Sequence, residues 1–352
     1  MGLHTVIMAG GKGERLWPAS RDGMPKQLFV LEGEKSLIRN TVDRLLPLTA
    51  PERMYVVTGN DIVTLIAREL PDLPRENILA EPFGRNTAAC IALAAAWISR
   101  NDPDGLMAVF PSDHLIRDTA AFQDTVAFGA QCLKDFPEYL ITIGIRPKYP
   151  ETGYGYIAPG EALSTGNVLN LYRVESFHEK PDRSRAEEYI NRGYLWNAGM
   201  FLWRVDAIMH AFERYMPKMY HDLVLLFSSK WRNEDILRFY QDVEAISIDY
   251  AIMEKASKVA VIPSAFSWND VGSWDAVGKL LVPDQNGNAV RGPSYLHESS
   301  HNVVWGCGKQ IVLIGIDNMV VVEGEDAVLV CPRKRSQDVS KVLKRLKGST
   351  PD

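Results

Sequence analysis

A glycine-rich, basic loop directly after an apolar strand is the feature that most constrains this chain. The apolar run 4–9 predicts a strand, and Gly10, Gly11 and Gly13 follow it. Glycine can take positive φ and turn its N–H toward an anion, and no side chain blocks close approach. The next residues carry more positive than negative charge, with Lys12, Arg15, Arg21 and Lys26 against Glu14 and Asp22. We interpret this segment as a loop that holds polyphosphate.

Three other interpretations of the loop fit less well. A Rossmann dinucleotide site needs a third glycine where this chain has Leu16, and Pro18 soon follows. A P-loop needs Ser or Thr after Gly-Lys, whereas Gly13 stands there. A glycine-rich turn without a ligand is the third alternative, but ordinary turns seldom combine three glycines with arginine and lysine.

Length, charge and hydropathy narrow the class of protein. The 352 residues exceed a typical single domain, so we expect one large domain and a smaller one. A net charge of −5 disfavours binding to nucleic acid or to a membrane surface, since both need a broad basic face. The longest apolar run, 88–98, is too short to cross a bilayer, and no charged leader precedes the first strand. We therefore expect a cytoplasmic protein.

The four cysteines support neither a zinc site nor a disulfide framework. Cys90, Cys132, Cys307 and Cys331 are far apart and show no Cys-x-x-Cys spacing. We expect buried free thiols.

The first half of the chain alternates short apolar runs with helical patterns. Predicted strands are 4–9, 54–58, 106–110 and 139–145, and an alanine-rich helix is predicted at 86–100. Such alternation predicts an α/β fold with a mostly parallel sheet covered on both faces. The longer strands from 153 to 204 are interpreted as a sugar-binding half on the same sheet.

The last seventy residues have a different pattern. Residues 284–288, Asp-Gln-Asn-Gly-Asn, resemble a linker, and short β-rich runs such as 318–322 and 327–331 follow. We therefore divide the chain into a catalytic domain, residues 1–283, and a small β-rich domain, residues 284–352. The basic segment 334–347 predicts a solvated helix.

Two aspartates are candidate metal ligands. Asp113 follows the strand 106–110, at the end where open α/β sheets bind ligands. Asp270 lies between Trp268 and Trp274, ahead of a predicted helix. Mg²⁺ takes one or two carboxylates and completes its shell with water and phosphate oxygens, so this pair would suffice. The alternative for Asp113 alone is a cap on the next turn.

Three further segments suit a sugar phosphate. Lys180, which we expect to be extended before Pro181, suits a phosphate monoester, and Glu179 suits sugar hydroxyls. The Asn197 amide both donates and accepts, so it can recognise a pair of hydroxyls. The segment 153–156, Gly-Tyr-Gly-Tyr, lets the backbone approach a sugar ring. Taken singly, each also fits ordinary turn or core chemistry.

These motifs together resemble a known family. The chain closely resembles the short, monofunctional mannose-1-phosphate guanylyltransferases, within the sugar-phosphate nucleotidyltransferases, in order over nearly its whole length. The motifs are GGKGERLWP (10–18), PKQ (25–27), EPFGRNTA (81–88), PSDH (111–114), FHEKP (177–181), WNAGMF (196–201), SIDYAIMEK (247–255) and WNDVG (268–272). The resemblance implies a Rossmann-like, GT-A-like catalytic domain with a small C-terminal β domain.

The resemblance also implies roles for single residues. Catalysis would use Arg15, Lys26, Asp113 and Asp270, and the two aspartates would bind Mg²⁺. The nucleotide site would comprise Ala9, Gly10, Gly11, Gly13, Arg15, Lys26, Glu81, Pro82, Arg85, Asn86 and Thr87. Mannose would contact Gly153, Tyr154, Glu179 and Asn197, and its phosphate would contact Lys180.

The implied reaction converts GTP and α-D-mannose 1-phosphate into GDP-mannose and pyrophosphate. A sugar-phosphate oxygen would attack the α-phosphorus in line, and because this oxygen is already anionic, no general base is needed. Glu81 or nearby carbonyls could accept from the donors of guanine, and the sequence leaves open which. The alternatives are a catalytically silent regulatory subunit that senses nucleotide sugar, or the same chemistry on another hexose or heptose 1-phosphate.

Two further expectations come from the family. Its members often form dimers, so a homodimer is expected. Longer relatives carry a phosphomannose isomerase domain after the region that matches this chain, so we expect no isomerase activity.

Overall fold

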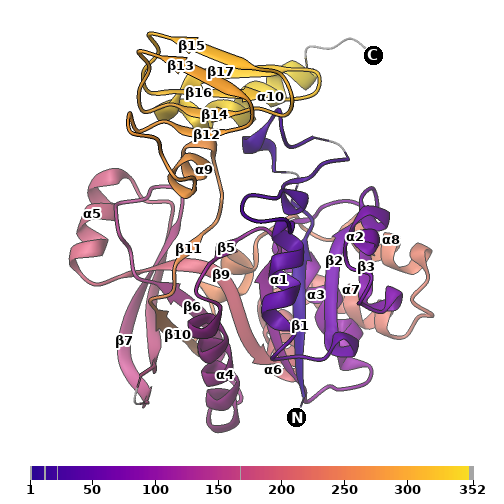
Figure 1. The fold of residues 1–352 in the computed structure, drawn as a ribbon. Coiled ribbons are helices and arrows are strands. Elements are labelled where there is room, and N and C mark those ends of the chain that lie inside the picture. The colour runs from indigo at the N-terminus through magenta and orange to yellow at the C-terminus, as the bar shows by residue number, and fades with distance from the viewer. Residues whose placement is uncertain (1, 12, 22, 167, 349–352) are drawn as a thin grey trace. The chain divides into compact units, whose positions relative to one another are not determined.

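Two compact units make up the chain, each with its own core (Figure 1). The computed structural model describes residues 2–11, 13–21, 23–166 and 168–348, so Lys12 and Asp22 of the basic loop lie outside the described residues. Unit 1 comprises residues 2–10, 39–112 and 116–268. Unit 2 combines residues 11–38 and 113–115 with the chain from residue 269 onward. The division into domains at residues 283 and 284 stays a prediction.

Unit 1 is built on a nine-stranded sheet with the order β3-β2-β1-β4-β9-β6-β10-β8-β7. Parallel pairing joins β1 to β2 and β4, β2 to β3, and β6 to β10, while β9 runs antiparallel to β4 and β6. The strands are β1 (Leu3–Ala9), β2 (Met54–Gly59), β3 (Ile78–Glu81), β4 (Leu106–Pro111), β6 (Leu140–Ile145), β7 (Gly155–Thr165), β8 (Asn170–Glu179), β9 (Leu195–Arg204) and β10 (Val259–Ser264). The predicted α/β class with a parallel-rich sheet is confirmed.

The helices of unit 1 include the alanine-rich α3, which packs against α6 and α7. They are α2 (Val63–Glu69), α3 (Asn86–Ser99), α4 (Thr119–Asp135), α5 (Arg183–Asn191), α6 (Val205–Tyr215), α7 (Pro217–Phe227) and α8 (Asn233–Asp242), and α1 (Leu37–Leu45) begins in unit 2. Residues 88–96 of α3 are all buried, and small alanine side chains allow this close packing. No helix in the described part of the chain is long and apolar enough to cross a membrane.

Unit 2 contains the glycine-rich loop and a C-terminal stack of short strands. These are β12 (Ala289–Arg291), β13 (Ser294–His297), β14 (Val303–Trp305), β15 (Ile311–Ile314), β16 (Met319–Glu323) and β17 (Val328–Pro332), with the helices α9 (Trp274–Leu280) and α10 (Val339–Gly348). The chain alternates between a sheet β12-β14-β16-β17 and a sheet β13-β15, so it coils as a short β-helix. The short strands β5 (Leu115–Ile116) and β11 (Trp268–Asn269) each span a unit border. The predicted small β domain is confirmed.

One hydrophobic cluster joins the glycine-rich loop to this β-helix. Leu16 and Phe29 of the loop share a buried core with Trp274, Trp305 and Val320. The ring of Phe29 stacks on Trp305 with centroids 6.3 Å apart. Because these contacts lie inside unit 2, the β-helix supports the loop directly.

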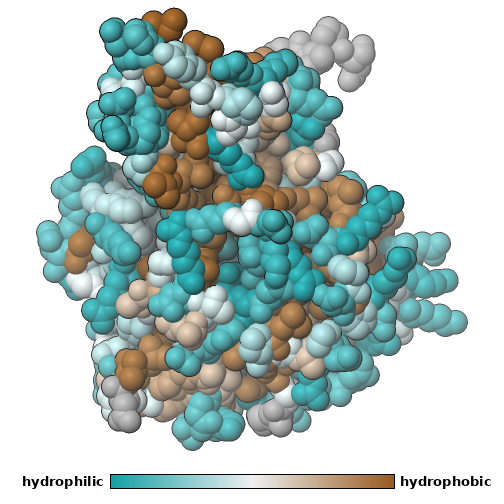
Figure 2. Space-filling model, in the orientation of Figure 1, coloured by the Kyte–Doolittle hydropathy of each residue, from teal (hydrophilic) through white to brown (hydrophobic). Residues whose placement is uncertain are grey.

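The outer face of the β-helix is partly apolar. Tyr295 on β13 and Val312 and Ile314 on β15 are large exposed hydrophobic residues. Figure 2 shows hydrophobic side chains in brown over the part of unit 2 that Figure 1 labels β13 and β15.

A buried pair of asparagines closes successive turns of the β-helix. Asn302 is fully buried, and its Nδ2 donates to Asn288 Oδ1 (3.0 Å) and to the Ile316 carbonyl (2.8 Å). Its Oδ1 accepts from the Met319 N–H (2.9 Å), and Asn288 in turn donates to Asp284 Oδ2 (3.0 Å). Residues 284–288, which resemble a linker in sequence, therefore form a hydrogen-bonded turn.

The four cysteines are free thiols, as expected. Cys90 and Cys132 are buried, but the expected burial is wrong for Cys331, which is half-buried, and for Cys307, which is exposed. It follows β14 in a surface turn, where its Sγ donates to the Glu323 carbonyl (3.2 Å).

Asn302→Ala is expected to lower the free energy of unfolding by about 2–4 kcal/mol, because it removes one side chain and leaves several buried polar groups unpaired. Urea unfolding, followed by tryptophan fluorescence, measures the change. The matched control is Asn286→Ala, which truncates an exposed asparagine of the same turn. Equal effects of the two substitutions would contradict a stabilising asparagine pair.

Candidate active site

The glycine-rich loop turns where the sequence predicts. Gly13 has φ 63°, and a Cβ on it would lie 2.6 Å from Lys26 Cβ, so both the backbone conformation and the packing require glycine. A Cβ on Gly11 would meet nothing within 4 Å. The backbone at Gly11 is therefore open to a ligand.

Lys26 joins three separate segments of unit 2. Its side chain is almost fully buried, and its Nζ lies 2.6 Å from Asp113 Oδ2. The same Nζ donates to the Asp270 carbonyl oxygen (2.5 Å). Burial raises the pKa of Asp113, but the charges of Lys26 and His114 outweigh it and hold that pKa below its usual value. Asp113 is therefore ionised at neutral pH.

Asp270 lies in a strained turn. Val271 has φ 51°, a conformation that β-branched residues rarely adopt. Asn269 Oδ1 accepts from the Val271 N–H (2.7 Å), and Asp270 Oδ1 accepts from the Gly272 N–H (3.0 Å). These hydrogen bonds fix the turn directly before Ser273, whose Oγ caps α9.

Arg15 is an exposed cation of the glycine-rich loop. It lies in a short 3₁₀ turn, Glu14–Leu16, and its side chain makes no hydrogen bond or ion pair with the described residues. Its guanidinium is thus available to an anion.

Asp113 and Asp270 suit a hard cation. Among the described residues, no group of three or more His, Cys, Asp or Glu side chains is placed to hold a metal. Mg²⁺ needs only one or two protein carboxylates when phosphate and water supply the other ligands. Both aspartates contact Lys26 Nζ, one through its carboxylate and one through its carbonyl, so oxygen donors already surround a positive charge here.

Unit 1 carries the residues predicted to bind the base. Glu81, at the end of β3, is 4% exposed, and its Oε1 accepts from Tyr240 Oη (2.8 Å). Burial raises the pKa of Glu81 to about 7, although the hydrogen bond from Tyr240 lowers it. A Cβ on Gly10 would lie 2.8 Å from Glu81 Oε2, so this close approach also needs glycine.

The segment after Glu81 is tied to neighbouring helical turns. Arg85 Nε donates to the Tyr240 carbonyl (3.1 Å), and its guanidinium lies over the ring of Phe83. Asn86, with φ 65°, begins α3. Thr87 Oγ1 accepts from the Ile248 N–H (2.9 Å). Of the predicted base-binding residues, Arg85 and Thr87 thus hold the segment in place, and the half-buried Pro82 lies between them and Glu81.

Asn197 is at the centre of the predicted sugar group. Its Nδ2 donates to Asp249 Oδ1 (2.7 Å), and its Oδ1 accepts from the Gly199 N–H (3.2 Å) and from Thr142 Oγ1 (3.3 Å). Burial and the neighbouring charge of Glu179 raise the pKa of Asp249, while the Asn197 hydrogen bond opposes them. The orientation of the amide is therefore fixed by the protein.

Lys180 departs from expectation. It has φ 45°, so the expected extended conformation is wrong; its N–H donates to the Tyr154 carbonyl (3.2 Å) where β7 and β8 separate. Its Nζ lies 2.5 Å from Glu179 Oε1. The Gly153 N–H donates to Glu151 Oε1 (3.0 Å).

Asp249 is a residue that the sequence analysis missed. It begins a π-helical turn, Asp249–Met253, and such turns frequently mark functional sites. The only signal in the sequence was the motif 247–255, to which we assigned no role. Its contact with Asn197 adds it to the candidate sugar group.

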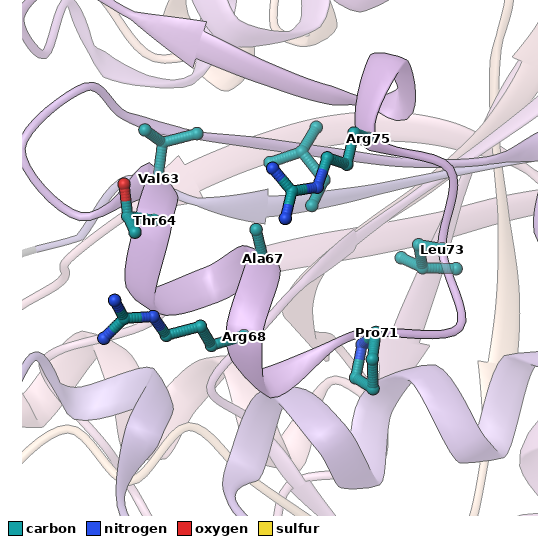
Figure 3. A pocket seen from close by; sticks show the side chains of 8 residues that line it. Val63, Thr64, Ala67, Arg68, Pro71, Leu73 and Arg75 are labelled. Atoms are coloured by element: carbon teal, nitrogen blue, oxygen red, sulfur yellow. The ribbon is translucent and has the colours of Figure 1, made fainter.

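A pocket elsewhere on unit 1 holds none of the predicted residues. It has a volume of about 580 Å³ and lies against α2 (Figure 3). Its lining residues are Val63, Thr64, Ala67, Arg68, Pro71, Leu73, Arg75 and Ile78.

Comparison with known proteins defines the class. A family model described as nucleotidyl transferase matches residues 4–284, and a model described as the MannoseP isomerase/GMP-like beta-helix domain matches residues 296–346. The fold is therefore that of a nucleotidyl transferase with a C-terminal β-helix.

Individual relatives define the family more closely. The mannose-1-phosphate guanylyltransferase of Klebsiella pneumoniae is 39% identical over 98% of this chain and 74% of its own length, and that of Escherichia coli is 38% identical over the same shares. A crystal structure named mannose-1-phosphate geranyltransferase, from Thermus thermophilus, is 33% identical with a TM-score of 0.87 over 99% of this chain and 100% of its own. The chain belongs to the mannose-1-phosphate guanylyltransferase family and is a nucleotidyltransferase.

A double-mutant cycle with Lys26→Met and Asp113→Asn is expected to give a coupling free energy of about 1–3 kcal/mol at pH 7. The reason is that removal of either side chain leaves the charge of the other poorly compensated. The lowered pKa of Asp113 sets the sign of the pH dependence. The contribution of ionised Asp113 to the free energy of unfolding is present above its pKa in the unfolded chain, about 3.9. This contribution is lost as the pH falls through the lower pKa that Asp113 has in the folded protein.

Urea unfolding of the four proteins measures this coupling. The exposed pair Lys258–Glu138, 2.9 Å apart, is the control and should give less than about 1 kcal/mol. A coupling for Lys26 and Asp113 no larger than that of the control would refute their ion pair.

Proposed function

We propose that this enzyme transfers GMP from GTP to α-D-mannose 1-phosphate, giving GDP-mannose and pyrophosphate. The main support is the group around Lys26, in which a buried cation and two aspartates lie beside an open glycine loop. Guanine as the base and mannose as the sugar are proposed because relatives of this chain are named mannose-1-phosphate guanylyltransferases.

The chemistry needs positioning and charge stabilisation. An oxygen of the sugar phosphate attacks the α-phosphorus of GTP, and the bond from that phosphorus to the β-phosphate oxygen breaks, so that pyrophosphate leaves with the bonding electrons. Because the attacking oxygen is anionic near neutral pH, no residue has to remove a proton. The charges of Arg15 and Lys26 stabilise the transferring phosphoryl group.

Asp113 and Asp270 are the residues that would hold Mg²⁺. When bound, the ion would neutralise charge on the phosphate oxygens. The ionised state of Asp113 and the fixed turn at Asp270 prepare both residues for this role.

Binding of the two substrates uses unit 1 as well. Residues 81–87 would hold guanine, and Gly153, Tyr154, Glu179 and Asn197 would hold mannose. Lys180 would bind the sugar phosphate, in exchange for its present partner Glu179. The proposal also includes a cytoplasmic location and, from the resemblance to a family that often forms dimers, a homodimer.

Pyrophosphate release should occur with GTP and mannose 1-phosphate, and only weakly with ATP or glucose 1-phosphate. The assay uses purified protein with Mg²⁺ and compares the four substrate pairs. Equal rates with GTP and ATP would refute the assigned base site. Binding of GDP-mannose without release from any pair would favour a regulatory subunit.

Asp270→Asn should lower kcat by about 10²- to 10³-fold, as loss of a charge-stabilising group typically does. Asp326→Asn, at an exposed aspartate of the same unit, is the control and should keep full activity. Circular dichroism checks that both variants fold. A fully active Asp270→Asn variant would overturn the assignment of Asp270.

A further inference from the structure

The two oxygens of the Glu81 carboxylate have different environments. Oε1 accepts a hydrogen bond from Tyr240 Oη at 2.8 Å, inside the core of unit 1. Oε2 makes no hydrogen bond with any residue that the structure describes, although the side chain is only 4% exposed. An almost buried carboxylate thus keeps one oxygen without a hydrogen-bond partner among the described residues, and this oxygen can accept a hydrogen bond from a ligand.

The uncovered oxygen faces the start of the glycine-rich loop. A Cβ on Gly10 would lie 2.8 Å from Glu81 Oε2, and among the described residues beyond its chain neighbours it would meet no other atom within 4 Å. The absence of a side chain at Gly10 therefore leaves Oε2 accessible beside the backbone that precedes the open position at Gly11.

Tyr240 is suited to donate a hydrogen bond to Glu81 Oε1 at all times. Its side chain is fully buried in the last turn of α8. Burial, together with the charges of Glu81 and Cys90, raises the pKa of the Tyr240 phenol well above its usual value. The phenol therefore stays protonated and donates at any pH at which the protein works.

Arg85 fixes the end of α8 to the segment that contains Glu81. The last carbonyls of a helix lack partners within the helix. Arg85 donates to two of them, at Tyr240 (3.1 Å) and Gln241 (3.3 Å). The ring of Phe83 also packs edge-on against Tyr240, with centroids 6.1 Å apart. Segment 81–85 and α8 thus form one connected structure.

We propose that Tyr240 is a positioning residue for base recognition, which holds Glu81 Oε1 so that Oε2 accepts from the donor edge of the purine base. The inference rests on the proposed function and deepens it, because it names the contacts that read the base. Guanine presents N–H donors at N1 and N2, whereas adenine presents an acceptor at N1. When Glu81 is ionised, its Oε2 attracts the N–H donors of guanine and repels the N1 acceptor of adenine.

The arrangement makes nucleotide affinity depend on pH. Glu81 must be ionised to accept from guanine, and its pKa is about 7, so GTP binding weakens as the pH falls below 7. Among the described residues, the titratable groups that interact with the charge of Glu81 are Tyr240 and Cys90, and both stay neutral because burial raises their pKa values. Loss of the Tyr240 hydroxyl removes a hydrogen bond that lowers the Glu81 pKa, which moves this midpoint to higher pH.

The test compares Tyr240→Phe with wild type in steady-state kinetics from about pH 6 to about pH 8. The expected result is a rise of about tenfold in the KM for GTP at pH 7, from the loss of one charge-assisted hydrogen bond. The midpoint of its pH profile moves upward, while kcat and the KM for the sugar phosphate stay unchanged. Glu81→Gln should abolish the pH dependence near 7 and reduce the preference for GTP over ATP.

The matched control is Tyr55→Phe. Tyr55 is a buried tyrosine of β2 that packs against His4, and its hydroxyl makes no hydrogen bond with the described residues. This variant should keep the wild-type profile. Melting temperatures show whether each variant folds, and Glu81→Gln tests the inference if Tyr240→Phe does not.

Two results would overturn the inference while the proposed function stands. One is an unchanged KM for GTP and an unchanged midpoint in Tyr240→Phe, with active wild-type enzyme. The other is pH dependence near 7 that survives in Glu81→Gln. Failure of the wild-type protein to bind GTP in calorimetry would instead refute the proposed function, and the inference with it.

Discussion

The arrangement of unit 2 depends on one buried ammonium group. Lys26 Nζ lies between the Asp113 carboxylate and the Asp270 carbonyl, so three stretches far apart in sequence meet at one charge. Removing a charge from water is costly unless partners replace the lost hydration. Asp113 and Asp270 supply that replacement, and the strained turn at Val271 holds the second of them in place. Stability and function therefore constrain the same atoms.

The two units supply different groups for the proposed binding of substrates. Unit 2 provides positive charge, which suits phosphates, and the carboxylates that we propose as ligands of Mg²⁺. Unit 1 provides polar side chains whose orientation the protein fixes, with Asn197 held by Asp249 and Glu81 held by Tyr240. In both units a neighbour holds a side chain that we propose for ligand binding, and preorganisation of this kind lowers the entropic cost of binding a ligand.

The sequence predicted the helices and strands that depend on local residue patterns. Buried strands such as β1 and β4 appear as apolar runs, and α3 appears as a run of alanine, so their positions were correct within a residue or two. The contact of Tyr240 with Glu81 spans 159 residues and leaves no local pattern. The positive φ of Lys180 and of Val271 was not predicted either, because neither residue type favours that conformation. The family motifs identified the residues but not the neighbours that hold them.

The shared core of the glycine-rich loop and the β-helix bears on how such proteins can be recombined. Leu16 and Phe29 pack on Trp305 and Val320, so the loop and the C-terminal strands have to match in shape. A chimera that joined residues 1–283 of this chain to the β-helix of a relative would pair a loop with a foreign surface. Exchange of both segments together would preserve that surface, and homologous domains are therefore interchangeable only along the borders of the packed unit.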